Sequence, residues 1–149
     1  MSGKIEASGS IQALDDFNEN LRYSHQYFCM FQNCRVLTKA PKLPAIKLTY
    51  RCYYRLFEQA ALVNAPELPA TTLADECYYA MFLLCSNLIN GPSELPAKTL
   101  VGKCYNSMFS TCKNLINAPI IYAETMPNNS IQSMFGGCSK VTYVKHYII

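Results

Sequence analysis

Five copies of one short pattern follow one another along most of this chain. An apolar residue followed by phenylalanine fixes their register, at Met30-Phe31, Leu56-Phe57, Met81-Phe82, Met108-Phe109 and Met134-Phe135. Successive pairs lie 25 to 27 residues apart. A repeat of this length buries its apolar face only against its neighbours. The chain is therefore expected to fold as a stack of similar units.

The spacing inside each copy predicts a short helix. Apolar residues recur every fourth position, as at Leu73, Cys77, Met81 and Cys85. That spacing places side chains on one face of a helix of about three turns. Thr72 and Asp75 suit its beginning, because a hydroxyl and a carboxylate favour the free amides there.

An extended piece is expected between successive helices. The segment 62–69 contains Pro66 and Pro69, which a helix interior excludes. One apolar column predicts the strands, at Leu37, Leu62, Leu88, Leu115 and Val141. Residues 141–149 are rich in β-branched and aromatic side chains and predict a last strand.

The repeated pattern L-x-x-A-P-x-L-P-A-x-x-L-x-x-x-C-Y-x-x-M-F-x-x-C resembles the BspA-type leucine-rich repeats, from about Phe31 to Val141. The resemblance implies an α/β repeat, a right-handed leucine-rich-repeat solenoid with a parallel strand ladder on one face and short helices on the other. It also implies an interaction role, since such arrays occur in surface and adhesion proteins of anaerobic bacteria and in some of their phages. Departures include Ala60 in place of the second cysteine, and Gln26 and Ser130 in place of the first.

The chain of 149 residues suits one domain. Its expected parts are an N-terminal cap or extension at 1–21, about five repeats at 22–141 and a C-terminal strand or cap at 142–149. The first part either covers the open end of the array, as stacked repeats require, or docks on a partner.

Charge and hydropathy exclude several classes of partner. The net charge is +3 and the basic residues are scattered, which does not indicate nucleic-acid binding. No apolar run approaches the length of a membrane span. The N-terminus lacks the apolar core of a secretory signal. The location stays open between a virion, the cytoplasm and a portion of a cell-surface protein.

The eight cysteines predict a ladder of reduced, buried thiols. Cys77 and Cys85 on one helix would be roughly 12 Å apart, whereas a disulfide needs Cα atoms within about 7 Å. The group His25, Cys29 and Cys34 lacks the paired ligand sets of a zinc site. A thiol enzyme would need a histidine base, and the other histidine is His146 in the tail. We expect no catalytic residue, no metal and no cofactor.

Two other residue types leave alternatives open. Tyr53, Tyr78 and Tyr105 follow the cysteine of three repeats and form either a half-buried stack with hydroxyls in water or an aromatic strip for contact. Asn64, Asn90 and Asn117 form either a ladder inside the solenoid that bonds the backbone or an exposed amide row. The first alternative is favoured in both cases.

The expected function is a non-catalytic protein- or glycan-interaction module for adhesion or recognition. The alternative is a structural component of a larger assembly, such as a virion or a surface appendage. Positions that differ between repeats on the strand face give the candidate surface, Lys39, Lys42, Val63, Asn64, Glu67, Ile89, Asn90, Glu94, Ile116 and Asn117. The apolar terminus Tyr147, Ile148 and Ile149 is a second candidate, for contact with another copy or a partner subunit.

Overall fold

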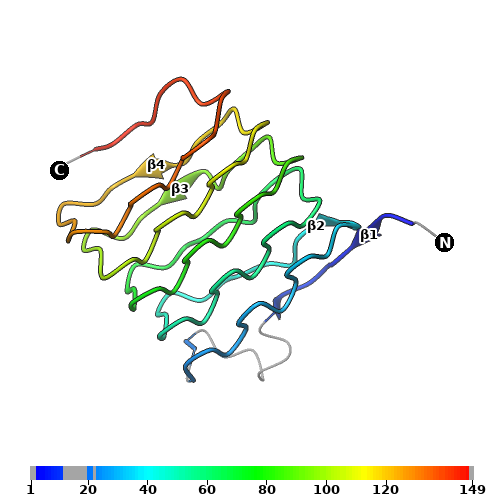
Figure 1. The fold of residues 1–149 in the computed structure, drawn as a ribbon. Helices are drawn as coiled ribbons and strands as arrows, with labels where there is room; N and C mark the ends of the chain where they lie inside the picture. The colour runs from blue at the N-terminus through cyan, green and yellow to red at the C-terminus, as the bar shows by residue number, and fades with distance from the viewer. Residues whose placement is uncertain (1–2, 12–19, 22, 148–149) are drawn as a thin grey trace.

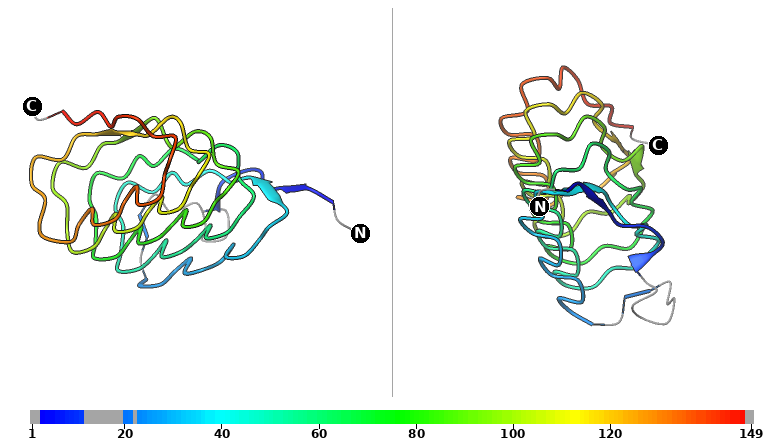
Figure 2. Two further views of the ribbon diagram at one scale, coloured as in Figure 1. Left: turned by 45° about the horizontal axis from the view of Figure 1, so that its top comes forward. Right: turned by 90° about the vertical axis from the view of Figure 1, so that its right-hand side faces the viewer.

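The chain winds into successive coils that stack side by side (Figure 1). This computed structural model describes residues 3–11, 20–21 and 23–147. Figure 2 shows the coils following one another in order from the N-terminal to the C-terminal end, staggered in the left view and one above another in the right view. We number the coils 1 to 5, each beginning with the segment that carries one of the five apolar-phenylalanine pairs.

Regular secondary structure is sparse. Strand β1 (Ile5–Glu6) pairs in parallel with β2 (Leu37–Lys39), and β3 (Glu94–Leu95) pairs in parallel with β4 (Ile120–Ile121). On the side of the stack that carries these strands, isolated parallel bridges also join the coils, among them Asn64 with Asn90 and Asn90 with Asn117. Of the leucine column, Leu62, Leu88 and Leu115 are buried but lie outside the strands.

The predicted leucine-rich-repeat solenoid is wrong. No short helix follows the prolines in any described coil, and the strands form two separate two-stranded sheets rather than a continuous ladder. The predicted last strand is also absent, since the described residues of 141–149 make one bridge, at His146. Residues 148–149 lie outside the described part.

A run of overlapping turns replaces each helix. In coil 3 the N–H groups of Met81, Leu83 and Cys85 donate to the carbonyl three residues earlier. The N–H groups between them, at Ala80, Phe82 and Leu84, donate to coil 4. Coils 1, 2 and 4 repeat this alternation, so almost every N–H is bonded without a helix.

The turn run explains the four-residue period that suggested a helix. Every fourth residue of the run takes a positive φ, as at Glu76 (55°), Ala80 (50°) and Leu84 (61°). Between them the chain turns two adjacent side chains into the core, a cysteine with a tyrosine and then an apolar residue with a phenylalanine. In coil 3 these pairs are Cys77-Tyr78 and Met81-Phe82, exposed by at most 1%.

The positive φ at Lys103 gives a test of the turn run. Lys103 is exposed and has a φ of 54°. An L-residue is strained there and glycine is not, so Lys103→Gly should be more stable than Lys103→Ala by about 1 kcal/mol. In a helix the order would reverse by about the same amount. Urea denaturation of the two variants measures the sign.

The first part of the chain covers one side of coil 1. The N–H groups of Ile5, Ala7 and Ile11 donate to carbonyls of coil 1, and Ile11 and Leu21 are buried. Leu14, Phe17 and the acidic residues near them lie outside the described residues. The choice between a cap and a docking segment, and the boundaries of the three parts, remain predictions.

Candidate interaction surface

The candidate surface residues come together on one side of the stack, which we call the strand face. It consists of three columns, each with one residue per coil. Their members are Thr38, Val63, Ile89, Ile116 and Thr142 in the first, Lys39, Asn64, Asn90, Asn117 and Tyr143 in the second, and Lys42, Glu67, Glu94, Ile120 and Lys145 in the third. All ten strand-face residues that the sequence predicted are exposed except Asn90, which is half-buried. The stacking therefore assembles the predicted surface.

Three asparagines form an amide row along the second column. Asn90 Nδ2 donates to Asn64 Oδ1 at 2.6 Å, and Asn117 Nδ2 donates to Asn90 Oδ1 at 2.5 Å. The favoured alternative, an interior ladder bonded to the backbone, is therefore wrong. Because Asn64 and Asn117 are exposed, the row presents amide groups at the surface.

An apolar stripe lies beside the amide row. Val63, Ile89 and Ile116 are exposed by 37%, 39% and 53%. Their backbones are held by the stack, since the N–H of Ile89 donates to Val63 and that of Ile116 donates to Ile89. Branched side chains on a fixed backbone lose little entropy when a ligand covers them.

The third column carries both signs of charge. Lys42 lies near one end and Lys145 at the other, with Glu67 and Glu94 between them. Glu67 accepts hydrogen bonds from the N–H and the hydroxyl of Ser93, which fixes its carboxylate against the next coil.

Of the cavities that adjoin the strand face, two lie at its opposite ends. The first, about 450 Å³, lies beside Lys39 and Asn64 and also includes Glu6. The second, about 420 Å³, lies beside Asn117 and also includes Tyr143 and Lys145. Sequence reasoning missed Thr142, Tyr143 and Lys145, because 142–149 was interpreted as a separate terminal strand. The repeat register contained the signal, since Tyr143 follows Asn117 by one repeat length.

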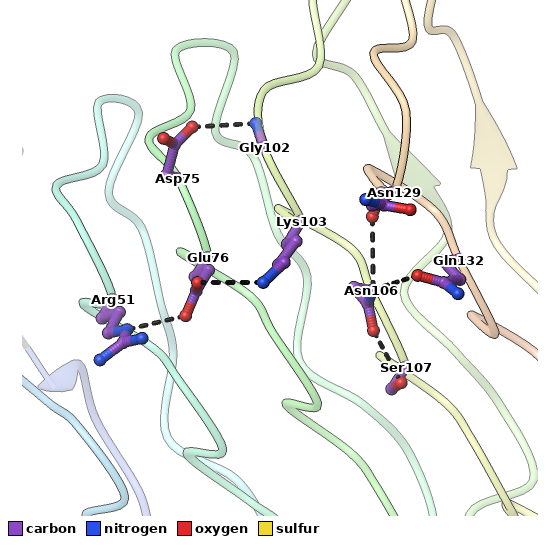
Figure 3. Close-up of polar contacts among 9 residues, drawn as sticks. All are labelled: Arg51, Asp75, Glu76, Gly102, Lys103, Asn106, Ser107, Asn129 and Gln132. Atoms are coloured by element: carbon purple, nitrogen blue, oxygen red, sulfur yellow. Dashed lines mark hydrogen bonds and ion pairs between the residues drawn. The ribbon is translucent and has the colours of Figure 1, made fainter.

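The opposite side of the stack uses its polar groups between coils (Figure 3). Glu76 bonds Arg51 at 2.7 Å in coil 2 and lies 3.9 Å from Lys103 in coil 4. Asp75, expected to begin a helix, instead accepts from the N–H of Gly102 in the next coil at 2.9 Å. These side chains stabilise the stack rather than offering a free binding surface.

Asn106 is a buried polar residue that also links neighbouring coils on this side of the stack. Its amide Nδ2 lies 3.4 Å from both the Asn129 carbonyl and Gln132 Oε1 in coil 5, and its Oδ1 accepts from Ser107 at 2.8 Å (Figure 3). The amide thus joins coil 4 to coil 5 in the way that Glu76 joins coils 2, 3 and 4.

The tyrosines that follow the cysteines form a core stack. Tyr53, Tyr78 and Tyr105 are exposed by at most 1%, and neighbouring rings lie 5.7 to 5.9 Å apart. Burial raises the pKa of each phenol. Neither the half-buried stack with wet hydroxyls nor the contact strip describes them. The half-buried rings are Tyr54 and Tyr79, which stack at 4.9 Å.

All eight cysteines are free thiols, and six of them are buried. In one column the thiols of Cys85, Cys112 and Cys138 donate to the carbonyls of Phe57, Phe82 and Phe109, at 2.9 to 3.0 Å. Burial raises the pKa of both Cys52 and Cys85 to about 12. These thiols are protonated at neutral pH and are poor nucleophiles.

The raised thiol pKa values predict a loss of stability in alkali. Because the folded pKa of Cys52 and Cys85 exceeds the ordinary value of 9.0, the unfolded chain releases their protons first as the pH rises. The free energy of unfolding should therefore fall between about pH 9 and 12, by up to about 1.4 kcal/mol per pH unit for each thiol. Urea denaturation across this range measures the slope.

Cys85→Ala is the matched variant for this test, since Ala60 fills the same column in coil 2. It should fold and should show a shallower decline with pH. An identical decline in the two proteins would mean that the buried thiol does not cause the effect.

Neither candidate histidine has a catalytic setting. The His25 ring packs against Phe28 and Tyr50, and His146 Nε2 lies 2.6 Å from the Ala123 carbonyl. Burial raises the pKa of Cys29, opposite to the shift that activates a thiol. Within the described part of the chain, no group of three or more His, Cys, Asp and Glu is placed to hold a metal ion. No described helix is long and apolar enough to cross a membrane.

The C-terminal end of the stack leaves backbone donors free. In coil 5, no described residue accepts from the N–H groups of Ile131, Ser133, Phe135 and Gly137. A largely apolar cavity of about 420 Å³ lies at this end, lined in part by Met126, Ile131 and Val144. Tyr147 is 48% exposed and stacks on Tyr122. Ile148 and Ile149 lie outside the described residues.

Comparisons with protein-family models, curated proteins and solved structures found no match to this chain. The resemblance to BspA-type repeats therefore remains a prediction from the repeated motif.

Proposed function

We propose that this chain is a non-catalytic interaction module that binds a protein or a glycan through its strand face. The observation that carries the proposal is the amide row with its apolar stripe, exposed on consecutive coils. Interfaces combine apolar contact at the centre with polar groups that fix orientation. Three adjacent coils repeat both elements at the same positions, which suits a ligand that is itself extended.

The backbone beneath the strand face supports a binding role because it is already ordered. Parallel bridges join Asn64 to Asn90 and Asn90 to Asn117, and the leucine column beneath them is buried. A pre-organised surface avoids the entropy cost of ordering a loop on binding.

The test is a binding screen of the purified protein against a glycan array and against surface proteins of its source. Ile89→Asp should weaken the affinity for a captured ligand by about tenfold or more, because it places a charge in the centre of the apolar stripe. Leu84→Asp is the matched control, since Leu84 is 41% exposed in the turn run of the same coil. Equal loss in both variants would show that the strand face is not the binding surface.

The alternative function, a structural component of a larger assembly, is favoured by the free donors of coil 5. A two-fold contact of this end with itself would place N–H groups opposite N–H groups. If coil 5 of one copy stacked directly on coil 1 of another, residues 141–147 of the first copy would collide with residues 5–11 of the second. Residues 5–11 already pair with coil 1, at the position that 141–147 would take. A partner subunit that supplies carbonyls fits this end better than a second copy.

Light scattering of the protein with and without its neighbouring gene products tests the assembly role. Ile131→Asp should abolish any complex formed through this end, because Ile131 lines the apolar cavity. A monodisperse monomer at high concentration, which captures no partner and is unchanged by deletion of residues 147–149, would contradict it.

A further inference from the structure

We propose that the cavity lined by coils 3, 4 and 5 at the C-terminal end of the strand face binds a saccharide that carries a carboxylate, of the uronic or sialic acid class. This inference rests on the proposed function, since it names the ligand class for the C-terminal end of the strand face. The cavity measures about 420 Å³ and is lined in part by Ser93, Ile116, Asn117, Thr142, Tyr143 and Lys145. Its volume lies in the range of small-molecule sites.

Tyr143 supplies an exposed aromatic ring to this cavity. Its side chain is 69% exposed, and its ring makes no stacking contact within the described part of the chain. The buried tyrosines, by contrast, stack on one another. A free ring beside a cavity suits the C–H face of a pyranose, which combines an apolar surface with polar edges.

Hydrogen-bonding groups line the same cavity. Asn117 donates through Nδ2 to Asn90, so its Oδ1 is available to accept from a sugar hydroxyl. Ser93 donates its hydroxyl proton to Glu67 and can accept in turn, while the hydroxyl of Thr142 can donate or accept. Alternating donors and acceptors beside an aromatic ring match vicinal hydroxyl groups.

Charge selects an acidic saccharide. Lys145 is the charged residue of the lining, and no described carboxylate pairs with it. Its backbone carbonyl accepts from Ile121 at 2.9 Å, which anchors it to coil 4. An unpaired ammonium in a neutral lining favours a carboxylate. The cavity at the other end contains both Glu6 and Lys39 and lacks this preference.

The test is an NMR titration of the protein with glucuronic acid and N-acetylneuraminic acid, with glucose and N-acetylglucosamine as neutral probes. The amide signals of Asn117, Thr142 and Lys145 should shift, and an acidic sugar should bind about tenfold more tightly than a neutral one at low salt. Lys145→Met should remove this preference, and Tyr143→Ala should weaken both kinds of sugar. Lys140→Met is the control, because Lys140 belongs to the same coil and donates to Asn114 instead.

Three results would overturn the inference. They are equal affinity for acidic and neutral sugars, unchanged selectivity in Lys145→Met, and absence of shifts around the cavity. If tetraglutamate competes as strongly as the acidic sugars, the ligand class is an acidic peptide rather than a saccharide. If the Ile89→Asp test succeeds while no sugar binds, the saccharide inference fails and the interaction module stands.

Discussion

Phe82→Ala is expected to lower the free energy of unfolding by about 3 to 5 kcal/mol, a large share of the stability of a small domain. Phe82 is fully buried, and its ring stacks between Phe57 at 5.8 Å and Phe109 at 5.3 Å. Truncation therefore leaves a cavity with ordered neighbours on both sides. Urea denaturation followed by tyrosine fluorescence gives the difference.

Phe135→Ala is the matched control for Phe82→Ala. Phe135 is partly buried in the last coil and stacks on one ring, Phe109, at 5.5 Å. Its truncation should cost clearly less than that of Phe82. A loss below about 1 kcal/mol for Phe82→Ala would show that the phenylalanine column is not the core of the stack.

Ala80→Pro is expected to prevent folding. The N–H of Ala80 donates to the Asn106 carbonyl at 2.9 Å, and its φ is 50°. Proline removes this donor and requires a φ near −65°, and a misplaced proline costs about 3 kcal/mol or more. The variant should show neither a cooperative thermal transition nor protection of the amides in coils 3 and 4.

Ala80→Gly separates the backbone effect from the loss of the methyl group. Glycine keeps the N–H and adopts the positive φ without strain, while the loss of a buried methyl costs roughly 1 kcal/mol. This variant should therefore remain folded. If Ala80→Pro folds as well as Ala80→Gly, the bond between coils 3 and 4 does not exist as described.

The repeat register and the buried columns were predictable because they depend on residue type alone. Cys77, Met81 and Cys85 are all fully buried, as the four-residue spacing requires. The same register placed Asn64, Asn90 and Asn117 in one row on the strand face. Stacking depends on this periodicity and not on which local conformation produces it.

The local conformation was not predictable from the spacing. A helix and a run of overlapping turns both return side chains to one face every four residues, and the positive φ values fall on residues such as Glu76 and Arg55 that give no sign of them. What distinguishes the two is the acceptor of every second N–H, which in the turn run lies in the next coil, 24 to 26 residues away. The helix prediction counted only bonds inside the repeat.

The asparagine row shows the same limit of local reasoning. An isolated Asn90 has backbone groups as its nearest partners, which favoured an interior role. In the stack, the side-chain amides of Asn64 and Asn117 bond it from both sides. The pairing follows from the repeat geometry and not from Asn90 alone.

The most direct test of the stack is NMR detection of scalar couplings across its hydrogen bonds. The described geometry predicts couplings from the amide nitrogens of Ala80, Phe82 and Leu84 to the carbonyl carbons of Asn106, Met108 and Ser110. A helix would instead couple each amide to the carbonyl four residues earlier, at Glu76, Tyr78 and Ala80. Observation of that second set in place of the first would contradict the stacked-coil fold.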